Sequence, residues 1–92
     1  MQYKELSGTG TFVLKSAPGY LQALQVNLSV ATTTVQIFDN ITNSAPAIAG
    51  GVAFALPAVG NTPTYNYDCH FSTGLTIVIG GSGTFSITVS YY

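Results

Sequence analysis

Apolar and polar residues alternate strictly in three short segments of the chain. From Leu24 to Val30 the even-numbered residues are aliphatic and the odd-numbered residues are polar. Residues 65–71 and 85–91 repeat the alternation, with mostly aromatic or β-branched residues at the apolar positions. A period of two places all the apolar side chains on one face of a β-strand. The alternation therefore predicts three strands, each buried on one face.

The first of these segments also fits a helix in part. Leu21, Leu24 and Leu28 have the spacing of a helical stripe. In a helix, however, Val26 and Val30 would lie off that stripe, so the strand is the favoured interpretation.

Further candidate strands are separated by residues that favour turns, such as Pro18-Gly19 and the glycine run at 80–83. Four segments qualify, of which 48–56 would contain a bulge or turn at Gly50-Gly51: residues 10–15, 33–39, 48–56 and 75–79. The last is apolar on both faces, so we expect it inside a sheet. This spacing predicts an all-β fold, a compact antiparallel β-sandwich or small jelly-roll-like barrel of about seven to eight strands.

The length of the chain limits the number of domains. Its 92 residues fill a single hydrophobic core, so we expect one β domain over residues 1–92. Within this domain, residues 1–7 are candidates for an extended N-terminal arm.

Charged residues are rare. Only five residues carry a formal charge: Lys4, Glu5, Lys15, Asp39 and Asp68. They make up 5% of the chain, where a soluble domain has roughly 25%. A net charge of −1 offers no basic surface to a phosphate backbone, so we expect no nucleic-acid partner. The longest apolar stretch, 45–60, is interrupted by glycine and proline, so we expect no membrane span. The expected partner is protein.

The sequence offers little to catalysis. Cys69 and His70 are the only residues of their kinds, so neither an internal disulfide nor a Cys/His zinc site is expected. Asp68 and His70 would share one strand face, but a catalytic or metal site needs a further acid or histidine, for which Asp39 is the nearest unused candidate. Cys69 would face the aromatic side, as a small hydrophobic residue. We predict no enzyme, no catalytic residue, no metal and no cofactor.

A stretch from Ala47 to Leu56 is apolar without alternation, as expected of a strand that is covered on both faces. One of those faces could meet a neighbouring subunit. The predicted interface residues belong to this stretch and to the N-terminal segment: Ile48, Val52, Phe54, Leu56, Tyr3 and Leu6.

Four parts of the chain resemble small proteins encoded by tailed bacteriophages. They are residues 67–78, 84–91, 10–16 and 35–40. Compact β-proteins of this group commonly serve as capsid decoration (cement) proteins, which sit as trimers over the three-fold contacts of the shell. The resemblance implies a homo-oligomer, a trimer, that bridges neighbouring major capsid proteins on the virion surface after synthesis in the bacterial cytoplasm.

Other functions fit the same fold. The main alternative is a tail-fibre or spike module that recognises a host glycan with exposed tyrosines, for which the candidates are Tyr20, Tyr65, Tyr91 and Tyr92. A head–tail connector component is a third possibility. The copy number per particle separates all three.

Overall fold

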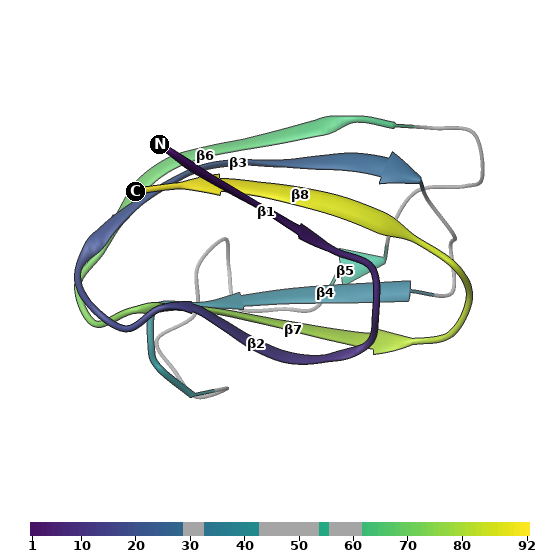
Figure 1. The fold of residues 1–92 in the computed structure, drawn as a ribbon, viewed down its shortest axis with the longest axis horizontal. Coiled ribbons are helices and arrows are strands. Elements are labelled where there is room, and N and C mark those ends of the chain that lie inside the picture. Colours follow the sequence, from purple (N-terminus) through teal and green to yellow (C-terminus); the bar gives the residue numbers. More distant parts are fainter. Residues whose placement is uncertain (29–32, 43–53, 56–61) are drawn as a thin grey trace.

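The protein is a sandwich of two antiparallel β-sheets, seen edge-on in Figure 1. The computed structural model describes residues 1–28, 33–42, 54–55 and 62–92. One sheet has the order β1-β8-β3-β6 and the other β2-β7-β4-β5. The strands are β1 (Gln2–Leu6), β2 (Gly10–Lys15), β3 (Gly19–Leu28), β4 (Thr33–Phe38), β5 (Phe54–Ala55), β6 (Thr64–Phe71), β7 (Leu75–Gly81) and β8 (Ser86–Tyr91). The predicted all-β sandwich is confirmed.

The core lies between the sheets and is built from the alternating residues. Inward-facing side chains of β8, such as Ile87 and Val89, are fully buried, and so are Leu24 and Val26 of β3. They pack in one cluster with the remaining buried residues, which are Leu6, Leu21, Val35, Ile37, Phe71, Leu75, Ile77, Ile79, Phe85 and Tyr91. Burial of this apolar surface is the main force that holds the two layers together.

β3 contains a β-bulge that explains the helix-like spacing of its leucines. Leu21 pairs with Tyr91 and Ala23 with Ser90, so Gln22 is an extra residue relative to β8. The bulge reverses the alternation, and Leu21 and Leu24 are consequently both fully buried. The strand interpretation is confirmed as far as Leu28, and residues 29 and 30 lie outside the described residues. Leu28 was misplaced: it is 45% exposed, after a second register shift.

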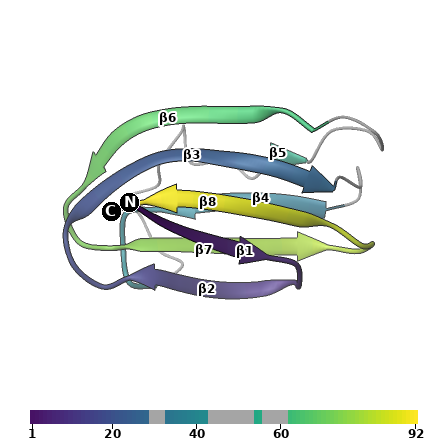
Figure 2. The same cartoon turned by 45° about the horizontal axis from the view of Figure 1, so that its top comes forward.

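The predicted N-terminal arm is wrong for most of its length. Residues 2–6 form β1, which pairs with β8 from Gln2 opposite Tyr91 to Leu6 opposite Ile87. This pairing satisfies backbone groups along one side of β8, which a free arm would leave unpaired. It also brings the two termini together, as Figure 2 shows.

Leu6 is a core residue and was wrongly assigned to an interface. Only 3% of its surface is exposed, and it packs in the central cluster. The single clear inward-facing residue of β1 thus anchors the strand to the core. Tyr3, the other predicted contact of this segment, is 71% exposed.

The described strands of the second sheet lie within or close to the segments predicted from the sequence. β7 lies between β2 and β4, as its apolar character predicted. The predicted strand 48–56 is described only at β5, which pairs with β4. Ile48, Val52 and Leu56 lie outside the described residues, and for Phe54 the backbone alone is described. In the described part of the chain, no helix is long and apolar enough to cross a bilayer.

Candidate functional site

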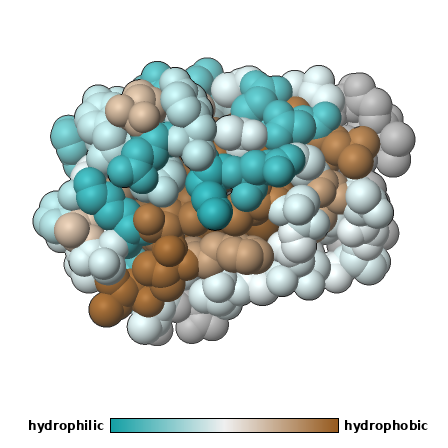
Figure 3. All heavy atoms as spheres, in the orientation of Figure 1, coloured by the Kyte–Doolittle hydropathy of each residue, from teal (hydrophilic) through white to brown (hydrophobic). Residues whose placement is uncertain are grey.

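The edge of the sandwich formed by β1 and β2 exposes apolar surface. Among the described residues, β2 pairs with β7 alone. None of its six residues is fully buried. Val13 is 49% exposed, and Phe12 and Leu14 pack against the core while staying partly accessible. Figure 3 shows apolar surface between the two layers on the side where β1 and β2 lie. We call β1 and β2 together the β1–β2 edge.

The two strands of this edge differ in charge. β1 carries Lys4 and Glu5, both exposed, and Glu5 accepts a hydrogen bond of 2.7 Å from the Ser86 hydroxyl. β2 carries a single ionisable residue, Lys15, at its end. A sheet edge without charge is open to pairing with another chain. The apolar edge strand is therefore β2.

β6 forms the opposite edge of the first sheet and is irregular and polar. Asp68 adopts a positive φ of 49°, where β6 has two residues opposite one residue of β3. Such a bulge twists an edge strand and hinders pairing with a further chain. The predicted alternation is confirmed here: Asn66, Asp68 and His70 are exposed, whereas the residues between them are partly buried.

Three aromatic rings meet at the end of the sandwich near the chain termini. The rings of Tyr20 and Tyr92 stack with centroids 5.2 Å apart, and His70 meets Tyr20 edge-on at 4.9 Å. The Tyr20 hydroxyl donates a 3.2 Å hydrogen bond to Asp68 Oδ1. We call Tyr20, His70 and Tyr92 the aromatic cluster.

Backbone contacts fix the position of this cluster. The Tyr92 N–H donates a 2.9 Å hydrogen bond to the Tyr20 carbonyl, and the Tyr20 N–H donates to the Tyr92 carbonyl. Gly19 is required here, because a Cβ atom would collide with that Tyr92 carbonyl and lie 2.7 Å from the Phe71 ring. Residue 92 is therefore held close against the start of β3.

The aromatic cluster borders an open depression of about 660 Å³. The depression is also lined by Lys15, Asp39 and Ser72, together with Pro18, Gly19 and Phe71. The chain has six Lys, Asp, Glu and His residues in total. Lys15, Asp39 and His70 line the depression, and Asp68 is bonded to Tyr20. This end of the molecule thus concentrates the few ionisable groups.

Asp39 stabilises the turn at residues 72–74 by accepting hydrogen bonds from it. Its carboxylate accepts hydrogen bonds from the backbone N–H groups of Ser72, Thr73 and Gly74 at 2.9–3.4 Å, and from the Ser72 hydroxyl. Partial burial opposes ionisation, but these donors outweigh it, and the pKa of Asp39 lies below its ordinary value. Asp39 follows β4 and holds the turn between β6 and β7, so it ties the two sheets together.

Within the described residues, no group of three His, Cys, Asp or Glu residues is placed to hold a metal ion. Burial, followed by the nearby charges of Asp39 and Asp68, raises the pKa of the Cys69 thiol. A thiol with a raised pKa is a poor nucleophile at neutral pH.

The outer face of the first sheet carries polar side chains that form hydrogen bonds with one another. Asn27 Nδ2 donates to the hydroxyls of Ser86 and Thr88 at 3.3 and 2.8 Å, and the Thr64 hydroxyl donates to the Gln25 side chain. Four of these residues border a second depression of about 460 Å³: Gln25, Asn27, Thr64 and Thr88. The rarity of charged residues in the sequence therefore does not make this face apolar, because its uncharged side chains are polar.

The tyrosines proposed for glycan binding separate into two groups. Tyr91 is buried and Tyr65 is partly buried against the core, whereas Tyr20 and Tyr92 lie side by side in the aromatic cluster. The predicted interface residue Phe54 lies in the sheet that also contains β2. The apolar triplet Phe12-Val13-Leu14 was missed as a candidate contact, although it breaks alternation as residues 47–56 do.

Comparison of the chain with protein-family models, with curated proteins and with solved structures finds no match in any of the three.

Proposed function

We propose that this protein is a structural virion protein that decorates a bacteriophage capsid, where it joins neighbouring subunits by protein–protein contact along the β1–β2 edge. The observation that carries the proposal is the exposed and mostly apolar edge strand β2, whose single charged residue, Lys15, lies at its end. Among the described residues its outer side is unpaired, and Val13 projects from it with half its surface exposed.

An edge strand of this kind favours a protein partner. Soluble proteins usually block their sheet edges with charges, prolines or bulges, because an open edge recruits further strands. β1 has Lys4 and Glu5, and β6 has the bulge at Asp68. β2 has a register shift only at its end, between Val13 and Lys15. A strand from a neighbouring subunit would supply the missing backbone hydrogen bonds and cover the apolar side chains.

The scarcity of charged residues agrees with a protein whose surface is covered by neighbouring subunits in an assembly. Each charge at a contact must lose its water when the surfaces meet, which costs free energy unless it finds a partner. Along β2 only Lys15 would face this cost. Many such contacts on a closed shell add through multivalency, so each can be weak.

The kind of assembly is inferred from the resemblance to small tailed-phage proteins. This resemblance supports a homo-oligomer, a trimer, bound to the major capsid protein on the outside of the virion. A tail-fibre or spike module is the alternative, and the aromatic cluster is the one observation that favours it, because Tyr20 and Tyr92 form an accessible tyrosine pair.

Copy number in purified virions tests this proposal. We expect the chain on the order of hundreds of copies per particle, measured by gel densitometry against the major capsid protein. A few dozen copies or fewer would support a tail or fibre part, about a dozen would support a connector, and absence from the particle would refute all virion roles.

A pair of variants connects the copy number with the β1–β2 edge. Val13→Lys places a charge on the exposed side of β2, and we expect it to lower incorporation at least tenfold. Asn66→Lys adds the same charge to an exposed position on β6, and we expect incorporation to stay unchanged. Equal incorporation of both variants would show that the β1–β2 edge is not the contact.

A further inference from the structure

We propose that the depression beside the aromatic cluster is a carbohydrate-binding site that takes a neutral pyranose ring. This site shares Lys15 with the β1–β2 edge, but it does not depend on the capsid role. The proposal rests on the shape of the depression, its exposed ring surface and its balance of charge.

An exposed aromatic surface is the first element of the site. Tyr92 is 51% exposed although its ring stacks on Tyr20, so one side of the ring is supported while much of it stays accessible. The ring of Tyr20 is held in turn by His70 and by the hydrogen bond to Asp68. A supported ring loses little conformational freedom on binding, which favours a ligand with a flat apolar face.

Polar groups around the rings are the second element. Lys15, His70 and Ser72 line the same depression and can donate or accept hydrogen bonds at its rim. The pyranose ring of a sugar has C–H groups on one face and hydroxyls around its edge. That combination matches an aromatic floor with polar groups beside it.

Charge excludes the two main alternatives. A phosphate or other anion would meet Lys15, but also the carboxylates of Asp39 and Asp68 close by. A quaternary ammonium would favour the aromatic rings but would meet the Lys15 ammonium in the same depression. Lys15 and Asp39 cancel in formal charge, so a neutral polar ligand is the best electrostatic fit.

The site is open, so we expect weak binding. A single sugar ring in an open site should have a dissociation constant of about 1–10 mM. Higher affinity would require several rings or several copies of the protein.

Titration followed by NMR tests the proposal. The probes are methyl α-D-glucopyranoside, methyl β-D-galactopyranoside and N-acetylglucosamine, each added to the full chain, with glycerol as a simple polyol control. We expect saturable shifts at Tyr20, His70 and Tyr92 with at least one sugar, and none with glycerol. No saturable shift with any of the three, or the same shifts with glycerol, would overturn the proposal.

Three variants assign the binding to the ring. Tyr92→Ala should weaken it at least tenfold, whereas Tyr92→Phe, which keeps the ring, should stay within about threefold of the wild type. Tyr3→Ala removes a tyrosine of β1 that is even more exposed, at 71%, and this variant should bind as the wild type does. Sugar binding that survives Tyr92→Ala would place the site elsewhere. Saturable binding of inorganic phosphate or tetramethylammonium instead of sugars would contradict the charge argument.

Discussion

β2 and β6 are both edge strands of the sandwich, yet they differ in the polarity of their exposed residues and in the position of their register shifts. β6 contains a bulge with Asp68 in a left-handed conformation, and it exposes Asn66, Asp68 and His70. β2 exposes Val13 between two partly accessible apolar residues. This contrast agrees with the proposed contact at the open edge, because charges and an irregular register both hinder pairing with a further chain.

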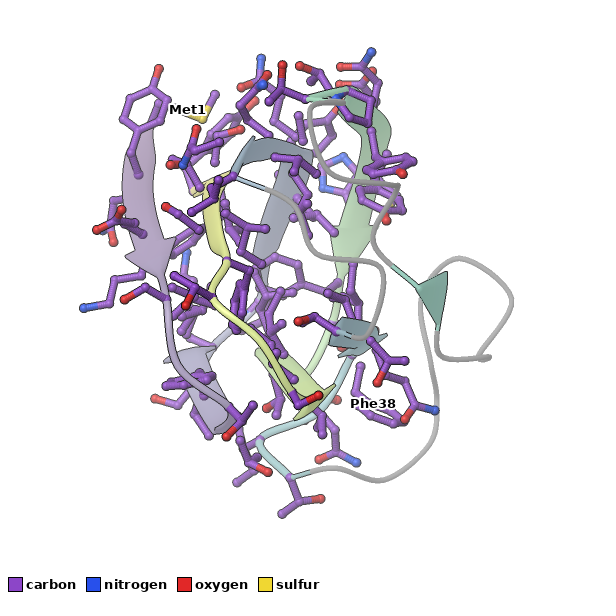
Figure 4. All side chains as sticks on the ribbon, turned by 90° about the vertical axis from the view of Figure 1, so that its right-hand side faces the viewer. Met1 and Phe38 are labelled. Carbon is purple, nitrogen blue, oxygen red and sulfur yellow. The ribbon has the colours of Figure 1, made fainter. Side chains whose placement is uncertain are left out.

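Met1, next to β1, and Phe38, at the end of β4, lie on opposite sides of the molecule in Figure 4. Met1 is 51% exposed, whereas Phe38 is only 7% exposed. Apolar exposure is not confined to the β1–β2 edge, however, since Leu28 is 45% exposed and Ile41 is 48% exposed.

The largest expected effect compares two phenylalanines, one from each edge strand. Phe71 of β6 is 2% exposed, and Phe71→Ala should lower the free energy of unfolding by about 3–5 kcal/mol. Phe12 of β2 is only partly buried, so Phe12→Ala should cost roughly half as much. Urea denaturation monitored by circular dichroism measures both. An equal loss for the two variants would mean that β2 is as well packed as β6.

The next effect concerns the turn that links β6 to the second sheet. Asp39→Ala removes the acceptor of three backbone N–H groups, and we expect a loss of about 1–2 kcal/mol in unfolding free energy. Asp39→Asn keeps one acceptor oxygen and should lose less. A loss below experimental error for Asp39→Ala would show that the turn holds without the carboxylate.

The same carboxylate makes stability depend on pH. The pKa of Asp39 is lower in the folded chain than its ordinary value of 3.8, so the unfolded chain takes up the proton first as the pH falls. The stabilisation is complete above pH 3.8 and is lost below it. The difference in thermal stability between wild type and Asp39→Asn should narrow as the pH falls from 6 to 2.5, and parallel curves would contradict this account.

The smallest effect tests the bulge of β6. Asp68 has a φ of 49°, a region that aspartate enters more readily than alanine. Asp68→Ala should cost about 1 kcal/mol, and Asp68→Gly, which relieves the backbone, should cost less despite losing the bond to Tyr20. A greater loss for glycine than for alanine would show that the side-chain bond and not the backbone determines this position.

The sequence predicted the strands well wherever burial alone decides the pattern. Alternation places Ile87 and Val89 in the core without knowledge of their partners. It failed at Leu28, because a register shift depends on the neighbouring strand. It also failed for residues 2–6, which carry one buried side chain, Leu6, and owe their strand to backbone pairing with β8.

The candidate sites were less predictable. Residues 20, 70 and 92 are distant along the chain and meet only because the ends of β3, β6 and β8 lie side by side in one sheet. Asp39 could not be assigned from sequence either, since its partners lie in a turn more than thirty residues away. By contrast, Phe12-Val13-Leu14 gave a local signal, a break in alternation, that sequence analysis could have used.

The central claim is that the β1–β2 edge is a contact between protein subunits. Sedimentation velocity of the purified protein at micromolar concentration tests it most directly. We predict an oligomer, a trimer, that Val13→Lys dissociates and Asn66→Lys leaves intact. A single 9.6 kDa species in the wild type, or an oligomer that survives Val13→Lys, would contradict the claim.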